Sequence, residues 1–197
     1  MNQQPVRRGR GRRPAAEVRT GVLEAAADLL FAEGMKAVTF ERVAAAAGSS
    51  KMTLYKWWPS AGALAAEAYF ARSRPVLAFP DTGDIRADLT TQLTAFVRLL
   101  TEGGAGPVIA GLIGTAQTDP DLAAAFRRDY SGPRRDLAVE ALDRAQQRGQ
   151  LRADLDVALL VDQLWGACYH RLLVLDAPLD EAFAVALVNN ALDGAAT

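Results

Sequence analysis

The chain is poor in the residues on which metal and redox chemistry depend. Its 197 residues include one cysteine, Cys168, and one histidine, His170. The sequence shows no metal-ligand spacing, no glycine-rich phosphate loop after a strand and no nucleophile motif. We therefore expect a protein that is not an enzyme, with no catalytic residues, no cofactor and no metal. Cys168 is interpreted as a small buried residue, and His170 as a core or interface residue.

Proline, aromatic residues and long apolar runs are also scarce. There are nine prolines and 7% aromatic residues, whereas alanine and leucine are abundant, which favours an all-α protein. No run is long enough to span a bilayer. The N-terminal arginines are not followed by the apolar segment of a secretory signal. A single cysteine cannot form an internal disulfide, so we expect a cytoplasmic protein without a membrane partner.

Charge is unevenly distributed along the chain. Residues 1–60 carry +5, from ten basic and five acidic residues, and residues 61–197 carry −6, from twelve basic and eighteen acidic residues. A basic end on an acidic body suggests that this end meets a polyanion. Residues 1–13 are predicted to be a disordered arginine-rich arm. Its Arg10, Arg12 and Arg13 are expected to reach DNA in a minor groove, unless the arm is only a solubilising tail.

Residues 39–58 have the pattern of two short helices joined by a glycine turn. Thr39 is a suitable N-cap for the alanine-rich first helix, and Gly48 can end it with a positive φ. In the second helix Leu54 and Trp58 are four residues apart, so both can face a core. This is a helix-turn-helix arrangement, whose second helix enters the major groove of DNA.

The remaining positions of this motif carry cations and neutral hydrogen-bond donors. Such groups neutralise phosphates and fix the orientation of a helix on DNA. With the arm, the predicted DNA-binding residues are Thr39, Ser50, Lys51, Met52, Thr53, Tyr55, Lys56, Trp57, Arg10, Arg12 and Arg13. Met52, Thr53 and Lys51 are placed best for base edges. Phosphate contacts are expected from Lys51, Lys56, Tyr55 and Trp57, and from backbone N–H groups at the helix starts, Thr39 and Ser50.

The chain divides at a segment rich in proline and glycine, residues 73–83. We predict a DNA-binding domain over residues 14–73, made of three helices and a fourth that leads away from them. A larger helical domain is predicted over residues 84–197. Its expected helices span residues 84–100, 108–117, 119–130, 133–148, 155–175 and 179–192, with a break at residues 131–133.

The first third of the chain resembles the TetR family of bacterial transcriptional regulators. The resemblance is carried by Gly34, Thr39, Val43, Ala44, Ala47, Gly48, Lys51, Leu54, Tyr55, Trp58 and Leu64, in the order and spacing that the family uses. The chain departs from that pattern at Ser49, at Trp57 and at Ala61-Gly62, where one expected phosphate-binding lysine is missing. The resemblance implies a homodimeric, ligand-responsive repressor that binds a near-palindromic double-stranded operator.

The last two predicted helices are candidates for the dimer interface. The helix over residues 155–175 is apolar on more than one side, so a second face needs cover. The resemblance implies a four-helix bundle formed by the last two helices of two subunits. The predicted interface residues are Ala167, His170, Ala184, Leu187 and Ala191. The alternative is that both faces lie inside one subunit.

The resemblance also implies a ligand pocket in the C-terminal domain. Its candidate residues are Phe96, Leu100, Leu112, Ile113, Phe126, Trp165 and Tyr169, an apolar set that suggests a hydrophobic small-molecule effector. Two other functions stay open. One is a sequence-neutral DNA-binding protein, and the other is a helical enzyme using carboxylates. Activation in place of repression is open as well, because operator position decides it.

Overall fold

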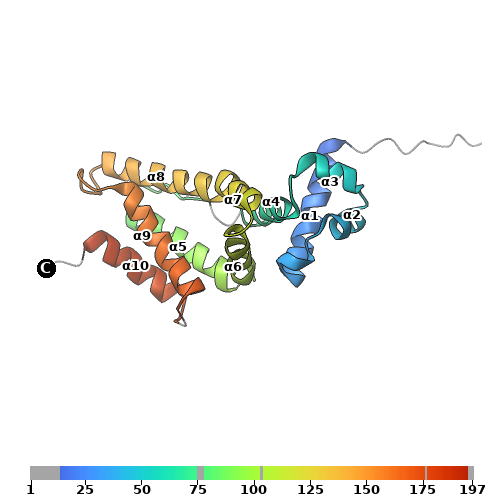
Figure 1. Ribbon diagram of the computed structural model, residues 1–197. Helices are drawn as coiled ribbons and strands as arrows, with labels where there is room; N and C mark the ends of the chain where they lie inside the picture. Colours follow the sequence, from blue (N-terminus) through green and yellow to red (C-terminus); the bar gives the residue numbers. More distant parts are fainter. Residues whose placement is uncertain (1–13, 75–77, 103, 176, 195–197) are drawn as a thin grey trace, which may run out of the picture.

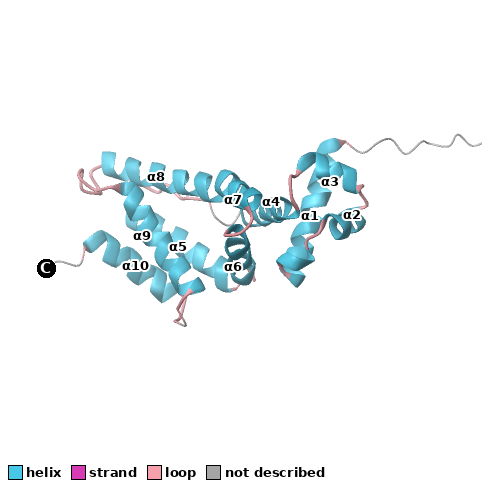
Figure 2. Ribbon diagram, in the orientation of Figure 1, coloured by secondary structure: helices cyan, strands magenta, loops and turns pink. Residues whose placement is uncertain are grey.

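The computed structural model describes residues 14–74, 78–102, 104–175 and 177–194, and every regular element in this part of the chain is a helix (Figure 2). The N-terminal elements are α1 (Ala15–Glu33), η1 (Met35–Ala37), α2 (Phe40–Ala47), α3 (Lys51–Trp57) and α4 (Ala61–Ser73). The body contains α5 (Ile85–Thr101), α6 (Ala105–Ala116), α7 (Pro120–Phe126), η3 (Arg127–Ser131), α8 (Gly132–Gln147), α9 (Val157–Leu173) and α10 (Glu181–Asp193). The predicted all-α fold is confirmed. Helices α1 to α4 form the head, which contains the helix-turn-helix, and α5 to α10 form the larger helical body.

Short polar side chains set the starts of the helices. The Thr39 hydroxyl accepts a hydrogen bond from Arg42 N at 3.2 Å, and the Ser60 hydroxyl accepts one from Ala63 N at 3.1 Å. Asp119 does the same for Leu122 N at 3.0 Å. Each satisfies an N–H group that the first helical turn leaves without a partner. The Thr39 cap of α2 is the one that the sequence analysis predicts.

Helix α4 joins the head to the body (Figure 1). It packs against α1 on one side and against α7 and η3 on the other. Gly62 suits this close packing, because a Cβ atom there would lie 3.0 Å from Asp119 Oδ2 and 3.2 Å from Leu122 Cβ, which is tighter than most Cβ contacts. The departure from the family pattern at this position therefore has a structural reason: it lets α7 approach α4 closely.

One predicted break is wrong. Residues 120–147 form one continuous helical stretch, in which the π-helical η3 links α7 to α8. Pro133 has no N–H group to donate, and a Cβ atom on Gly132 would lie only 2.7 Å from Arg127 O. The residues that suggest a break thus widen the helix into a π turn, since both allow the backbone to depart from α-helical hydrogen bonding.

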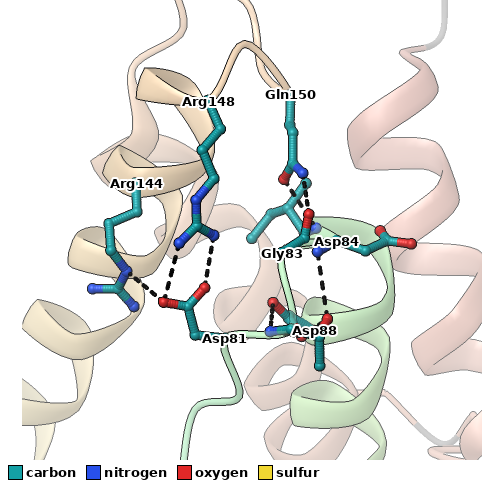
Figure 3. Close-up of polar contacts among 9 residues, drawn as sticks. Asp81, Gly83, Asp84, Asp88, Arg144, Arg148 and Gln150 are labelled. Carbon is teal, nitrogen blue, oxygen red and sulfur yellow. Dashed lines mark hydrogen bonds and ion pairs between the residues drawn. The ribbon is translucent and has the colours of Figure 1, made fainter.

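Polar contacts hold the segment between α4 and α5 to the body (Figure 3). Asp81 accepts a hydrogen bond from Arg148 Nη1 at 2.7 Å and lies 3.2 Å from Arg144 Nε, both near the end of α8. The buried Asp88 carboxylate accepts from the Thr82 hydroxyl at 2.7 Å and from the Thr82 backbone N–H. The start of α5 is therefore fixed against the far end of α8.

Within the described residues, no single helix has the length and apolar composition needed to cross a membrane. Only α5 and α6 taken together would meet that requirement, and they are bent by 86° with respect to each other. Both helices contribute buried residues to the core of the body.

Candidate DNA-binding helix and ligand cavity

Helix α3 is held by the residues that the spacing predicts. Gly48 ends α2 at φ +60° and ψ +36°, a conformation that only glycine adopts without strain. Leu54 and Trp58 are buried in the head. The Trp58 indole donates to Glu67 Oε2 of α4 at 2.7 Å, and Arg19 of α1 donates to the same oxygen at 2.7 Å. Helix α3 is thereby fixed against both α1 and α4.

The opposite face of α3 is open to solvent. The Met52 side chain is 78% exposed, and Tyr55 is 58% exposed. Tyr55 also packs edge-on against Phe40 of α2, with ring centroids 4.6 Å apart, which orients its phenol. Lys56 is exposed and makes no ion pair within the described residues. A thioether, a phenol and an ammonium group on one exposed helix face suit a groove lined with phosphates.

Four other residues predicted to contact DNA make side-chain contacts with other residues of the head. Lys51 pairs with Glu41 of α2, which lowers the pKa of that carboxyl. The Ser50 hydroxyl accepts from Thr53 N at 3.1 Å and lies 2.9 Å from the Thr53 hydroxyl. Trp57 is half-buried against Trp58, with ring centroids 5.6 Å apart. Like the capping residue Thr39, these side chains shape the motif, and any DNA contact is additional to that role.

The arm lies outside the described residues, with Arg10, Arg12 and Arg13. Its expected contact with DNA therefore stays a prediction.

The body contains a cavity of about 250 Å³ between α5, η3, α8 and α9. Three of the predicted pocket residues, Phe96, Trp165 and Tyr169, line it. The other four do not. Leu100 and Leu112 are buried core residues, and Ile113 packs against the core. Phe126 lies behind the lining, against Tyr130, with ring centroids 5.3 Å apart.

The polar side of this cavity is formed by residues that were not predicted from the sequence. Tyr130, from the π turn, and Arg134, one helical turn later, both line it. Arg135 and Asp162 form an ion pair in the same lining, with Nε and Oδ1 2.9 Å apart. The i, i+4 spacing of Tyr130 and Arg134 was the available signal, but the predicted break at residues 131–133 concealed it.

Cys168 is buried in α9 and has no disulfide partner. Burial raises the pKa of its thiol to about 12, so the thiol remains protonated at neutral pH. Among the described residues, no group of three or more His, Cys, Asp or Glu side chains is placed to hold a metal ion.

The predicted dimer residues fall into different environments. Ala184 is fully buried inside its own subunit, because α10 packs against α5, so its assignment to an interface is wrong. Ala167, Leu187 and Ala191 are half-buried, and His170 is exposed. A stripe on the outer face of α9 repeats at helical spacing and is exposed: Leu159, Gln163, Gly166, His170 and Leu173.

An exposed second helix in a helix-turn-helix head, carried on a helical body, defines a DNA-binding regulator. Residues 22–68 match the family described as bacterial regulatory proteins, tetR family, and residues 79–191 match the tetracyclin repressor-like C-terminal domain. The chain belongs to the TetR family and is a DNA-binding transcriptional regulator.

Individual relatives agree with this assignment. The uncharacterized HTH-type transcriptional regulator YdeS of Bacillus subtilis is 36% identical over 185 residues, 94% of this chain and 93% of that protein. The DNA-binding transcriptional repressor TetR of Mycobacteroides abscessus is 31% identical, over 89% of this chain and 93% of its own length. The crystal structure of the TetR family transcription regulator SCO0332 is 57% identical, with a TM-score of 0.85, and the match covers 92% of this chain and 100% of that one.

Proposed function

We propose that the chain acts as a homodimeric, cytoplasmic repressor that binds a near-palindromic operator and has no catalytic activity. The observation that carries this proposal is the two-sided α3, which buries Leu54 and exposes Met52 and Tyr55. Such a helix can enter the major groove while its inner face anchors it to the head. The 31% identical relative from Mycobacteroides abscessus, a DNA-binding transcriptional repressor, supports repression over activation.

A second subunit would cover the outer faces of α9 and α10. Leu159 and Leu173 on α9 are 53% and 42% exposed, and Val185 on α10 is 40% exposed. Apolar side chains on two adjacent helices favour a two-fold interface, in which both copies use the same patch. Two heads related by that axis would read half-sites about 34–36 Å apart.

The cavity would hold the effector, and α4 would carry its influence to the head. Tyr130 lines the cavity and stacks on Phe70 of α4, with ring centroids 4.4 Å apart and the planes within 7° of parallel. Closer to the start of α4, Glu67 accepts hydrogen bonds from Trp58 and Arg19. A ligand that displaces Tyr130 therefore has a contiguous packed route to α3. It releases DNA only if it binds the released state more tightly.

The test is fluorescence anisotropy of the purified full chain on duplexes that flank its own gene, against a scrambled duplex at near-physiological salt. A repressor of this kind should prefer one near-palindromic site by about a thousandfold or more. Selection from random DNA extends the search if no flanking site binds. Equal affinity for every sequence, with only a salt dependence remaining, would indicate sequence-neutral binding and refute the proposal.

A further inference from the structure

The walls of the body cavity are aromatic. Phe96 of α5 and Tyr169 of α9 pack edge to face, with ring centroids 5.6 Å apart, and Trp165 lies one helical turn before Tyr169. An apolar cavity of about 150 Å³ accommodates benzene, and drug-sized ligands occupy about 300–1,000 Å³. The cavity of about 250 Å³ lies between these sizes, so it fits a compound of one or two rings.

The charged residues in the lining leave an excess positive charge. Arg135 and Asp162 neutralise each other through their ion pair. Arg134 then contributes a net charge of +1 to the lining, from two cations and one anion. With the Gln92 amide oriented to satisfy both of its neighbours, its oxygen accepts from Arg134 Nη2 at 2.9 Å and its nitrogen donates to Ala78 O at 2.8 Å. The guanidinium is thus held in place, and it stays charged although burial lowers its pKa.

A buried hydroxyl group lies beside Arg134 in the cavity lining. Tyr130 is 5% exposed, and its hydroxyl lies close to the hydroxyls of Tyr69 and Tyr169, which influence its pKa. Burial raises the pKa of Tyr130, so the phenol remains protonated and able to donate. A hydroxyl group can accept from one neighbour and turn its own proton toward an acceptor in the cavity.

We propose that this cavity binds a small aromatic carboxylate of one or two rings. Arg134 and the Tyr130 hydroxyl receive the carboxylate, and the ring lies among Phe96, Trp165 and Tyr169. A guanidinium beside a neutral donor matches an anion with two acceptor oxygens, while an organic cation would be repelled by Arg134. The inference rests on the proposed function only in naming this ligand as the effector. The binding itself needs no DNA.

The test is isothermal titration calorimetry of the full chain with three matched probes: 2-naphthoate, naphthalene-2-carboxamide and (2-naphthyl)methylammonium. We expect the acid to bind about tenfold or more tightly than the amide, because hydrogen bonds to a charged group are the stronger kind, and the ammonium to bind worst. Arg134→Gln should remove the preference for the acid. Arg134→Lys, which keeps the charge, should retain part of it. Arg152→Gln is the matched control, because Arg152 is 74% exposed between α8 and α9 and does not line the cavity, and it should leave the preference intact.

The possible outcomes distinguish a failure of the ligand assignment from a failure of the proposed repressor function. Equal binding of acid and amide, or an acid preference that survives Arg134→Gln in a folded variant, would overturn the assignment of the anion site. Failure of all three probes to bind would overturn the cavity as a site for ring compounds, and specific DNA binding by the same sample would leave the repressor proposal standing. Acid binding that leaves the operator complex unchanged would support the ligand class and instead count against its role as effector.

Discussion

Lys56 tests whether the exposed face of α3 contacts DNA. Its ammonium group is exposed and makes no ion pair within the described residues, whereas Lys51 is paired with Glu41. We expect Lys56→Ala to weaken binding to all DNA sequences about equally. The dependence of log Kobs on log salt concentration should become shallower by about one unit, the effect of losing one phosphate contact.

Arg152→Ala is the matched control. This side chain is 74% exposed in the connection between α8 and α9, at the opposite end of the molecule from α3 (Figure 1). It should leave the salt dependence unchanged. A salt slope for Lys56→Ala equal to that of the unmodified protein would remove Lys56 from the set of phosphate contacts.

Single residues differ in how far the sequence predicts their roles. The burial of Leu54 and Trp58 and the exposure of Met52 follow from helical spacing alone. The pairing of Lys51 with Glu41 does not, because it depends on how α2 crosses α3. The cavity shows the same limit. Leu112 and Trp165 are both apolar residues on helices of the body, and only the packing of those helices makes one core and the other lining.

At the scale of elements, helix starts were predictable and the π turn was not. Caps are local signals, read from Thr39, Ser60 and Asp119 without knowledge of the rest of the fold. The sequence around Gly132 and Pro133 is also a local signal, but it is compatible with either a break or a widened helical turn. Packing of η3 against α4 accompanies the second outcome, and this contact is not visible in the sequence.

Gly132→Ala tests the π turn. A Cβ atom at this position would lie 2.7 Å from Arg127 O, and a backbone oxygen cannot move without moving the turn. We expect the free energy of unfolding to fall by about 1–3 kcal/mol, the usual cost of overpacking. Chemical denaturation followed by circular dichroism measures it.

Gly114→Ala is the control for the same chemical change. Gly114 lies within α6, and an added Cβ would meet nothing within 4 Å. Replacing glycine by alanine in such a helix should stabilise the protein by about 0.5–1 kcal/mol. Equal effects of the two substitutions would show that the π turn tolerates a side chain and that its glycine is not required.

At the scale of the whole molecule, the charge differs between the two parts of the chain. The basic first 60 residues contain α3, which we propose contacts DNA, and the acidic remainder contains α4 and the body with its cavity. This difference in charge can be counted from the sequence, because it depends on composition alone. The residues that we propose to face a second subunit could be chosen only from the fold: Ala184, expected at the interface, is fully buried, and Val185 beside it is exposed.

Val185→Asp tests the proposed dimer. Val185 is 40% exposed on the outer face of α10, and a second subunit would bury it. An unpaired carboxylate there would have to lose its hydration, so we expect the dimer dissociation constant to rise by about tenfold or more. Sedimentation equilibrium should report twice the chain mass of 21.0 kDa for the unmodified protein and a shift toward 21.0 kDa for the variant at equal concentration.

Leu137→Asp is the matched control for Val185→Asp. Leu137 is 50% exposed on α8, outside the α9–α10 face, so the same kind of change there should leave the mass unchanged. A monomeric Val185→Asp variant should also lose most of its affinity for a two-half-site operator while keeping weak binding to a single half-site, because each head is intact. If Val185→Asp stays dimeric and Leu137→Asp does not, the interface lies on α8 and the predicted spacing of the two heads would have to be derived again from that face.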